Sequence, residues 1–157
     1  GGQFVTTIIA GNGPVGFGGL TGALPSGHIN PRPLADTMSP VQGMDKNGTT
    51  AVIKSVSKLP QHRFTMGGPL NVRLSPQLLE TDRDLNNFVA FLRTCEELGI
   101  FQIQTNVISS DLLRKAMKDP ENYRDLMVRV ASYCSYFVEL DEKTQMDIIN
   151  RTEQVAW

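Results

Sequence analysis

The sequence is poor in cysteine and in long apolar runs. Two cysteines, Cys95 and Cys134, occur in 157 residues, so they build no disulfide framework, and without a CxxC or Cys/His cluster they offer no zinc site. No run of 18 apolar residues and no charged-then-apolar leader is present, so we expect neither a membrane span nor a signal peptide. These absences favour two reduced thiols in a cytoplasmic protein.

A strong net charge is absent as well. Fifteen Lys and Arg residues balance 16 Asp and Glu residues, giving -1 at pH 7, so the overall charge indicates neither nucleic acid nor a membrane surface as partner. A chain of 157 residues holds one domain with a real core. It opens on "GGQFVTT" without an initiator methionine, so we expect a piece of something longer or a processed form.

Glycine and proline are concentrated at one end of the chain. Thirteen of the 14 glycines and eight of the nine prolines lie in residues 1–76, which are net basic, whereas residues 77–157 are net acidic. We therefore predict one α/β domain over 1–157. Its first part is expected to form strands and long ordered loops, and its second part helices with short strands.

The apolar periodicity places the elements within this domain. It predicts strands at 3–10, 69–75, 101–108, 126–130 and 136–140, and helices at 50–59, 82–98, 110–118 and 142–152. The helix over 82–98 has the clearest ends, since Thr81 and Asp84 resemble a capping box and Gly99 is a natural stop. Cys95 lies on its apolar face, which favours a buried thiol over a reactive one.

A GxGxxG pattern lies near the start, at Gly11, Gly13 and Gly16. A dinucleotide site needs a helix to open at the third glycine, so that its N-terminus meets the pyrophosphate. Pro14 and the glycine-rich run that follows disfavour any helix here, and the next acidic residue, Asp36, lies on a proline-rich loop. We therefore predict no nicotinamide or flavin site, and a backbone that packs tightly or approaches a ligand closely.

Three longer stretches resemble the C-terminal region of the glycyl radical enzymes, in the family's order. They are residues 20–59, "PLNVRLSP" (69–76) and 103–153, and they look more like the diol dehydratase, C–N lyase and decarboxylase branches than like pyruvate formate-lyase. The resemblance implies the C-terminal part of a ten-stranded α/β barrel made of two half-barrels. In such a barrel a cysteine loop, whose thiyl radical abstracts hydrogen from substrate, meets a glycine loop that stores the radical.

The family's radical motif reads approximately R-V-[AS]-G-[YF]-x-[AV]. The stretch "RVASYCSYF" (129–137) matches it at Arg129, Val130, Ala131 and Tyr133, but Ser132 stands where the glycine belongs. A glycyl radical is planar and stabilised by both neighbouring amides. A seryl Cβ replaces one α-hydrogen and adds bulk, which in a packed loop costs roughly 1–3 kcal/mol, and a positive φ would add strain. We predict that this chain holds no normal glycyl radical, whether Ser132 is natural or introduced.

Other parts of the family's pattern are missing or altered. The catalytic cysteine loop belongs upstream, and "TCEEL" (94–98) does not correspond to it. "GHINPRP" stands where the family often reads G-R-K-A-G. Whether Arg32 takes the place of the family's arginine stays open at this point. Gln104 and Asn106, on the strand before the loop, either hold the radical loop by hydrogen bonds or form a plain solvated strand face. The 20–48 loop is expected to line the barrel interior.

The function implied by the resemblance is that of an anaerobic, cytoplasmic radical lyase or dehydratase, here radical-dead. A separate activating enzyme with an iron–sulfur cluster and S-adenosylmethionine would install the radical, so we expect no metal or organic cofactor in this chain. Expected partners are that enzyme, the Cys-loop-bearing remainder or a homologous partner, and a second copy in a full-length homodimer, with no nucleic acid and no membrane.

Other functions stay open. The chain is alternatively a non-catalytic spare-part or pseudo-enzyme protein that docks with a glycyl radical enzyme. Weaker alternatives are a pyruvate formate-lyase (formate C-acetyltransferase) type acyltransferase and an unrelated α/β binding module. The substrate cannot be read, because the family's discriminating pocket residues lie mostly upstream.

Overall fold

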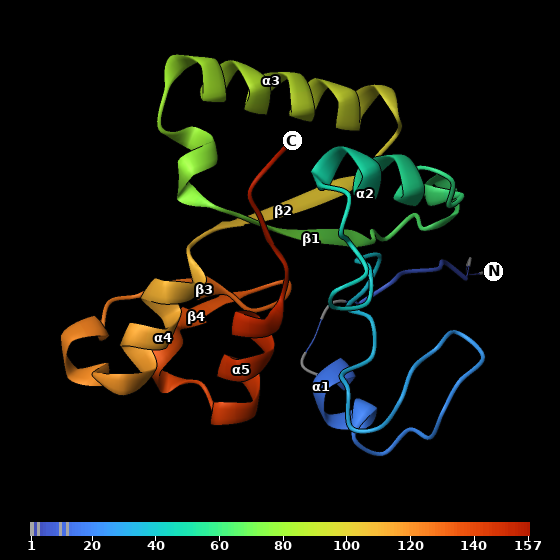
Figure 1. The fold of residues 1–157 in the computed structure, drawn as a ribbon. Helices are drawn as coiled ribbons and strands as arrows, with labels where there is room; N and C mark the ends of the chain where they lie inside the picture. The colour runs from blue at the N-terminus through green and yellow to red at the C-terminus, as the bar shows by residue number, and fades with distance from the viewer. Residues whose placement is uncertain (1, 3, 10, 12) are drawn as a thin grey trace.

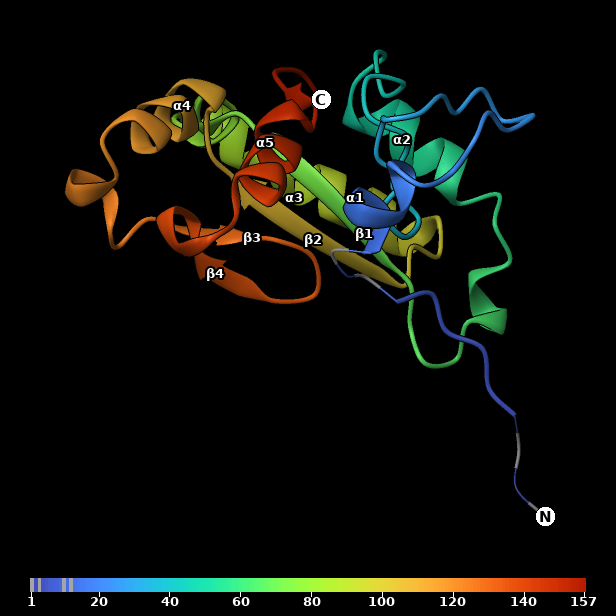
Figure 2. The same cartoon turned by 90° about the horizontal axis from the view of Figure 1, so that it is seen from below.

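A parallel sheet at the centre of the fold separates two groups of helices. The computed structural model describes residues 2, 4–9, 11 and 13–157. Its sheet has the order β2-β1-β5, in which β1 (Pro69–Leu74) pairs in parallel with β2 (Gln102–Val107) and with the short β5 (Glu153–Gln154). Figure 1 shows α2 (Thr49–Val56) and α3 (Asp82–Glu97) on one side of this sheet, and Figure 2 shows the other α-helices and a β-hairpin on the opposite side.

The first hydrophobic core lies between this sheet and helices α2 and α3. It joins Val52, Ile53, Val56, Leu70, Val72, Leu74, Phe91 and Cys95. The prediction for α3 is confirmed together with its ends. The Thr81 hydroxyl accepts the Asp84 N–H at 3.2 Å, the Asp84 carboxylate accepts the Thr81 N–H at 3.1 Å, and Gly99 follows with a φ of 69°. The buried position of Cys95 confirms a core thiol.

A second core belongs to the C-terminal part of the chain. It is built by α4 (Ser110–Lys118), α5 (Glu142–Asn150) and a hairpin of β3 (Met127–Arg129) and β4 (Cys134–Tyr136) around the fully buried Phe137. Both helices begin as predicted, because Ser109 accepts the Leu112 N–H at 3.2 Å and Asp141 accepts the Thr144 N–H at 3.1 Å. Short 3₁₀ helices complete the described chain at Gln61–Arg63, Pro76–Leu79, Pro120–Tyr123 and Phe137–Glu139.

Two predicted strands are wrong. Residues 4–9 form no strand, and residues 3 and 10 lie outside the described part of the chain. Ile8 donates to Gly67 O at 3.1 Å without starting a ladder, and Phe4 is fully exposed, since β-branched residues favour a strand only where neighbours pack against them. The strand predicted over 136–140 ends at Tyr136, because Phe137 turns into the second core and begins a 3₁₀ helix.

The glycine-rich segment near the start contains a helix, contrary to the prediction. Residues Gly13–Gly18 form α1, with Pro14 in its first turn, where the missing N–H of proline is no loss. Close packing is found at Gly18, where a Cβ atom would lie 2.3 Å from Arg32 O, whereas at Gly11 and Gly16 it would meet nothing within 4 Å. The close backbone approach that was predicted for the GxGxxG pattern therefore occurs at Gly18, two residues after the pattern ends.

Candidate functional site

The sequence "RVASYCSYF" folds into the tip of the β3–β4 hairpin. Arg129 pairs with Cys134 in the antiparallel register, and the Val130 N–H donates to Tyr133 O at 2.9 Å. Ala131 and Ser132 therefore occupy the turn. Val130 and Ala131 are buried, whereas Ser132 and Cys134 are exposed. The hairpin tip therefore exposes Ser132, the residue that stands at the position of the family's radical glycine.

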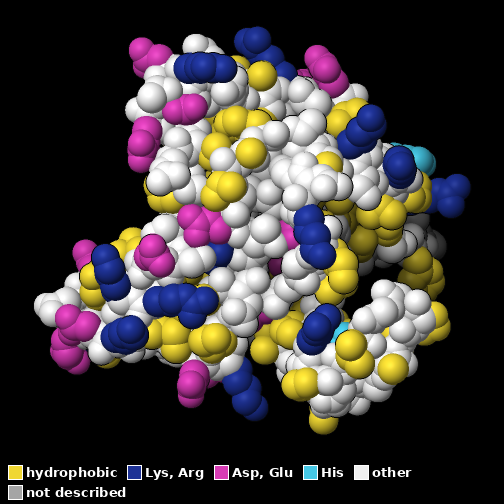
Figure 3. Space-filling model, viewed as in Figure 1, with side chains coloured by type: hydrophobic (Ala, Val, Ile, Leu, Met, Phe, Trp, Pro, Cys, Tyr) yellow, Lys and Arg dark blue, Asp and Glu magenta, His cyan; other side chains and the backbone are white. Residues whose placement is uncertain are grey.

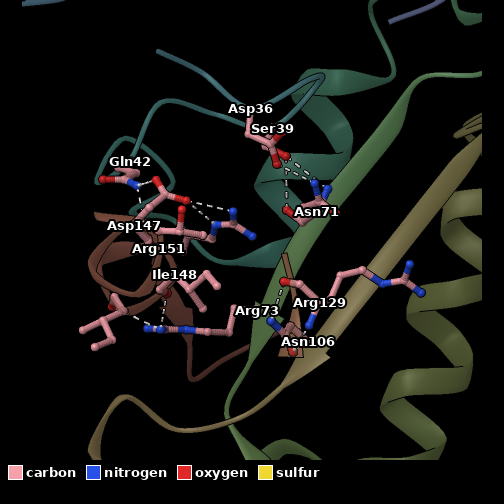
Figure 4. A network of polar contacts seen from close by, with 12 residues as sticks. Asp36, Ser39, Gln42, Asn71, Arg73, Asn106, Arg129, Asp147, Ile148 and Arg151 are labelled. Atoms are coloured by element: carbon pink, nitrogen blue, oxygen red, sulfur yellow. Dashed lines mark hydrogen bonds and ion pairs between the residues drawn. The ribbon is translucent and has the colours of Figure 1, made fainter. Parts of the chain in front are cut away.

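Asn106 on β2 anchors this hairpin to the central sheet (Figure 4). Its side-chain Nδ2 donates to Arg129 O at 3.1 Å, and its Oδ1 accepts the Arg129 N–H at 3.4 Å. Arg129 in turn donates from Nη1 to Ser132 O at 3.1 Å. A chain of hydrogen bonds thus runs from β2 through Arg129 to the residue at the turn, and the predicted contact of Asn106 with the loop is present.

The backbone at Ser132 shows no need for glycine. Thr37 is the only non-glycine among the described residues with φ in the left-handed region, so the extra strain expected for a positive φ at Ser132 does not arise. The effect of its Cβ on the planarity of a radical stays a prediction.

Gln104 lies on the same strand face as Asn106 but differs from it in its contacts. In the register of β1 and β2, Gln104 pairs with Asn71 and Asn106 pairs with Arg73, so four polar side chains share the face opposite α2 and α3. The Gln104 Oε1 is buried and has no hydrogen-bond partner among the described residues. Gln104 lines a cavity together with Asn71 and Arg73, and its predicted hydrogen bond to the radical loop is not among the described contacts.

Arg73 is a buried cation that sequence reasoning missed. It is 5% exposed, donates to Ile148 O at 2.9 Å and Ile149 O at 3.1 Å, and bonds the Ser110 hydroxyl at 2.8 Å. Burial lowers its pKa, while the nearby charge of Glu153 works in the opposite direction. Cations stabilise helix C-termini, so Arg73 fixes the end of α5 to the sheet. A charge inside the apolar strand "PLNVRL" was the available signal.

Asp36 places the loop before α2 against the same polar face. Its carboxylate accepts from Asn71 Nδ2, and the Ser39 hydroxyl accepts the Asn71 N–H at 3.0 Å. Burial raises the pKa of Asp36, and the hydrogen bond from Asn71 offsets part of that effect. Asp36 and Ser39 therefore hold this loop against β1, and the lining of a barrel interior by the 20–48 loop stays a prediction.

Further contacts tie this loop to the C-terminal end. Gln42 Nε2 donates to the Asp147 carboxylate at 2.6 Å, and Arg151 Nη2 forms an ion pair with the same carboxylate at 2.8 Å. Asp45 accepts from Gln154 Nε2 at 2.9 Å and from the Thr152 hydroxyl. The site is thus a layer of polar contacts between the loop, the sheet and the hairpin.

Neither a metal site nor a membrane-spanning helix is found in the part of the chain that the structure describes. None of its groups of His, Cys, Asp and Glu has the arrangement of a metal site. None of its helices combines the length and apolar character needed to cross a membrane.

Comparison with known proteins places the hairpin in a defined family. The family described as "Glycine radical" matches residues 34–138, a span that contains the second half of the loop before α2, strands β1 and β2, and the whole hairpin. The match therefore covers more than half of the chain.

Similar proteins are several times longer than this chain. Isethionate sulfite-lyase of Bilophila wadsworthia is 41% identical over 140 residues, covering 88% of the chain and 17% of the relative. Trans-4-hydroxy-L-proline dehydratase of Clostridioides difficile is 37% identical over 154 residues, covering 98% and 19%. The glycerol-bound B12-independent glycerol dehydratase from Clostridium butyricum shares 42% identity and a TM-score of 0.95, with 99% and 20% covered. The chain spans about a fifth of these relatives.

Proposed function

Since the chain belongs to the glycyl radical family, we propose that it is the C-terminal, loop-bearing part of an anaerobic radical dehydratase or lyase whose Ser132 prevents a normal glycyl radical. The carrying observation is the anchored hairpin, whose turn holds Ser132 between the buried Ala131 and the exposed Tyr133. Relatives that are dehydratases and lyases by name support this class of reaction.

The remainder of the enzyme is proposed to complete a ten-stranded barrel and to supply the cysteine loop. Strand β2 pairs only with β1 among the described strands, so its outer edge is open to a further strand. Apolar side chains are exposed on the lobe formed by α1 and the loop after it (Figure 3), including Phe17 at 64% and Leu20 at 83%. The open strand edge and the exposed apolar side chains are both typical of a surface that another part of a protein covers.

We further propose that a separate cytoplasmic activating enzyme, which holds the iron–sulfur cluster and S-adenosylmethionine, acts on this loop. Such an enzyme must bring its 5′-deoxyadenosyl radical against the α-carbon of residue 132. The exposure of Ser132 at a hairpin tip supports that access. A full-length homodimer is part of the same proposal.

A second candidate function is that of a spare part that docks with a glycyl radical enzyme without catalysing a reaction. Two separate hydrophobic cores, one under α2 and α3 and one around Phe137, support a unit that folds by itself. With Ser132 in the turn, such docking would not resupply a radical.

Electron paramagnetic resonance of a Ser132→Gly chain tests the assignment of the loop. The chain is treated anaerobically with a radical-activating enzyme and S-adenosylmethionine, with and without the Cys-loop-bearing part of a relative. We expect a glycyl-type doublet, and we expect none from the control Ser135→Gly on β4. A silent Ser132→Gly chain, with a relative activated in parallel, would contradict the assignment.

A further inference from the structure

The segment after α5 crosses the edge of the central sheet and reaches the helices on its other side (Figure 1). Its strand β5 pairs with β1, and the Ser75 N–H donates to Gln154 O at 2.9 Å. Trp157 then packs on Phe88 and Phe91 of α3, with ring centroids 5.7 Å and 5.4 Å away. The segment therefore leaves the second core and makes contact with the first.

Gln154 is a second anchor of this segment, residues 152–157, which we call the clasp. Gln154 is buried, and its Nε2 donates to the Asp45 carboxylate at 2.9 Å and to Asp45 O at 3.2 Å. The Thr152 hydroxyl donates to the same carboxylate. Val155, between the two anchors, is 68% exposed. A short strand added to a sheet edge, with pockets for selected side chains, is a recurring mode of peptide binding.

Three features keep the hold on the clasp weak. Strand β5 is only 2 residues long. Trp157 Nε1 is buried without a hydrogen-bond partner among the described residues, and an unpaired buried donor costs about 1–3 kcal/mol. A cavity of about 250 Å³ adjoins the ring and is lined by Thr50 of α2 and Asn87 of α3, so the indole leaves part of its site unfilled. Segments held by few buried contacts open locally before the rest of a fold.

We propose that the clasp is releasable and that it occupies a peptide-docking groove formed by the edge of β1, Asp45 and the space between α2 and α3. The partner that fits this groove is an extended peptide with a glutamine three residues before a tryptophan, because the clasp itself has this pattern. Release exposes the edge of β1 at Ser75, whereas the buried residues of both cores lie outside the clasp. The inference goes beyond the proposed function, since it needs neither a radical, nor an activating enzyme, nor the remainder of the barrel.

Binding of the synthetic peptide TEQVAW, which repeats residues 152–157, to the 157-residue Trp157→Ala chain tests the groove. Trp157 is the only tryptophan of the chain, so the indole fluorescence comes from the peptide alone. We expect its emission to shift to shorter wavelength with saturation, because the indole leaves water. Replacing the peptide's glutamine with alanine should weaken binding about two- to tenfold, as expected for lost hydrogen bonds. Replacing its valine, the counterpart of the exposed Val155, should leave binding unchanged.

Hydrogen exchange tests release of the clasp within the chain. In the Trp157→Ala chain we expect the Ser75 amide, which donates to Gln154 O, to lose protection. The Val130 amide, which donates within the hairpin, should keep its protection. Val155→Ala is the matched control in the same segment and should leave both amides unchanged.

The outcomes separate a releasable clasp from an integral part of the fold. A Trp157→Ala chain that unfolds as a whole, or that loses protection at Val130 as well as at Ser75, would overturn the proposal. An emission shift that grows linearly without saturation, or equal binding of the glutamine and alanine peptides, would also overturn it. None of these results bears on the resonance signal expected from a Ser132→Gly chain, which keeps its own Trp157.

Discussion

The side-chain amide of Asn106 pairs with the backbone of Arg129, donating to its carbonyl at 3.1 Å and accepting its N–H at 3.4 Å. The amide acts as one more rung between two strands that belong to separate sheets, since β2 lies in the parallel sheet and β3 in the hairpin. Arg129 in turn donates from Nη1 to Ser132 O at 3.1 Å, which links Asn106 to the turn. Asn106 is therefore the positioning residue for the turn.

Replacing Asn106 with leucine is expected to loosen the hairpin. The change leaves the partly buried N–H and C=O of Arg129 without partners, at a cost of about 1–3 kcal/mol. Urea denaturation gives the change in the free energy of unfolding, and hydrogen exchange gives the protection of the Arg129 amide. The control Gln104→Met removes an amide from the same face and should leave that protection unchanged. Equal protection in the Asn106→Leu chain would contradict the positioning role.

Replacing Arg73 with methionine is expected to destabilise the whole chain. The change removes the donor for Ile148 O and Ile149 O and the ion-pair partner of Glu153, which keeps its hydrogen bonds from Ser110. Breaking a buried ion pair costs about 3–5 kcal/mol. Arg124→Met is the matched control, because Arg124 forms an exposed pair with Glu121 that contributes less than about 1 kcal/mol. Similar urea midpoints for the two variants would argue against Arg73 as the link between β1 and α5.

The raised pKa of Asp36 makes stability depend on pH. Burial raises this pKa, opposed by Asn71 and the charge of Arg151 and reinforced by Asp147. The folded state then binds more protons than the unfolded state between the two pKa values, so stability falls as the pH rises through that window. Asp36→Asn removes the titration and keeps an acceptor for Asn71. Its unfolding free energy relative to the parent should therefore increase from acid to neutral pH.

Urea denaturation at a series of pH values measures this difference. Asp141→Asn is the control of opposite sign, because the Thr144 hydroxyl lowers the pKa of Asp141. The parent chain should gain stability over that variant above the unfolded pKa of Asp141, and lose it as the pH falls through the folded pKa. An Asp36→Asn advantage that shrinks with rising pH would show that the pKa of Asp36 is not raised.

Substitution of Gly18 by alanine is expected to disturb α1 and the loop after it. The new Cβ would lie 2.3 Å from Arg32 O, and such overpacking costs about 1–3 kcal/mol. Gly16→Ala provides the control within the same helix, since its Cβ meets nothing within 4 Å. Thermal unfolding should separate the two variants, and equal melting temperatures would contradict the close approach at Gly18.

Local chemistry made part of this fold predictable. The capping pair of Thr81 and Asp84, with Gly99 as the stop, sets the ends of α3 through contacts within a few residues. The alternation of β2 placed Gln104 and Asn106 on one face, and the structure pairs Asn106 with the hairpin. These features depend on spacing along the chain, which a sequence shows directly.

The features that the sequence predicted wrongly or did not reveal depend on partners far away along the chain. A strand over residues 3–10 needs a neighbouring strand, and residues 4–9 have none among the described elements. The partners of Arg73 lie 75 and 76 residues away along the chain, and those of Asp36 lie 35 residues away. Helix α1 formed despite its glycines, because Leu34 donates to Pro14 O at 3.0 Å and holds the loop against it.

The Cβ at position 132 is the centre of the account, and electron paramagnetic resonance of three chains tests it most directly. The parent chain, Ser132→Ala and Ser132→Gly are treated in parallel with a radical-activating enzyme and S-adenosylmethionine under anaerobic conditions, and the spins per chain are counted. Alanine keeps the Cβ but lacks the hydroxyl, so its silence would assign the effect to the Cβ. We predict a glycyl-type doublet from Ser132→Gly alone. A doublet of comparable intensity from the parent chain would contradict the account.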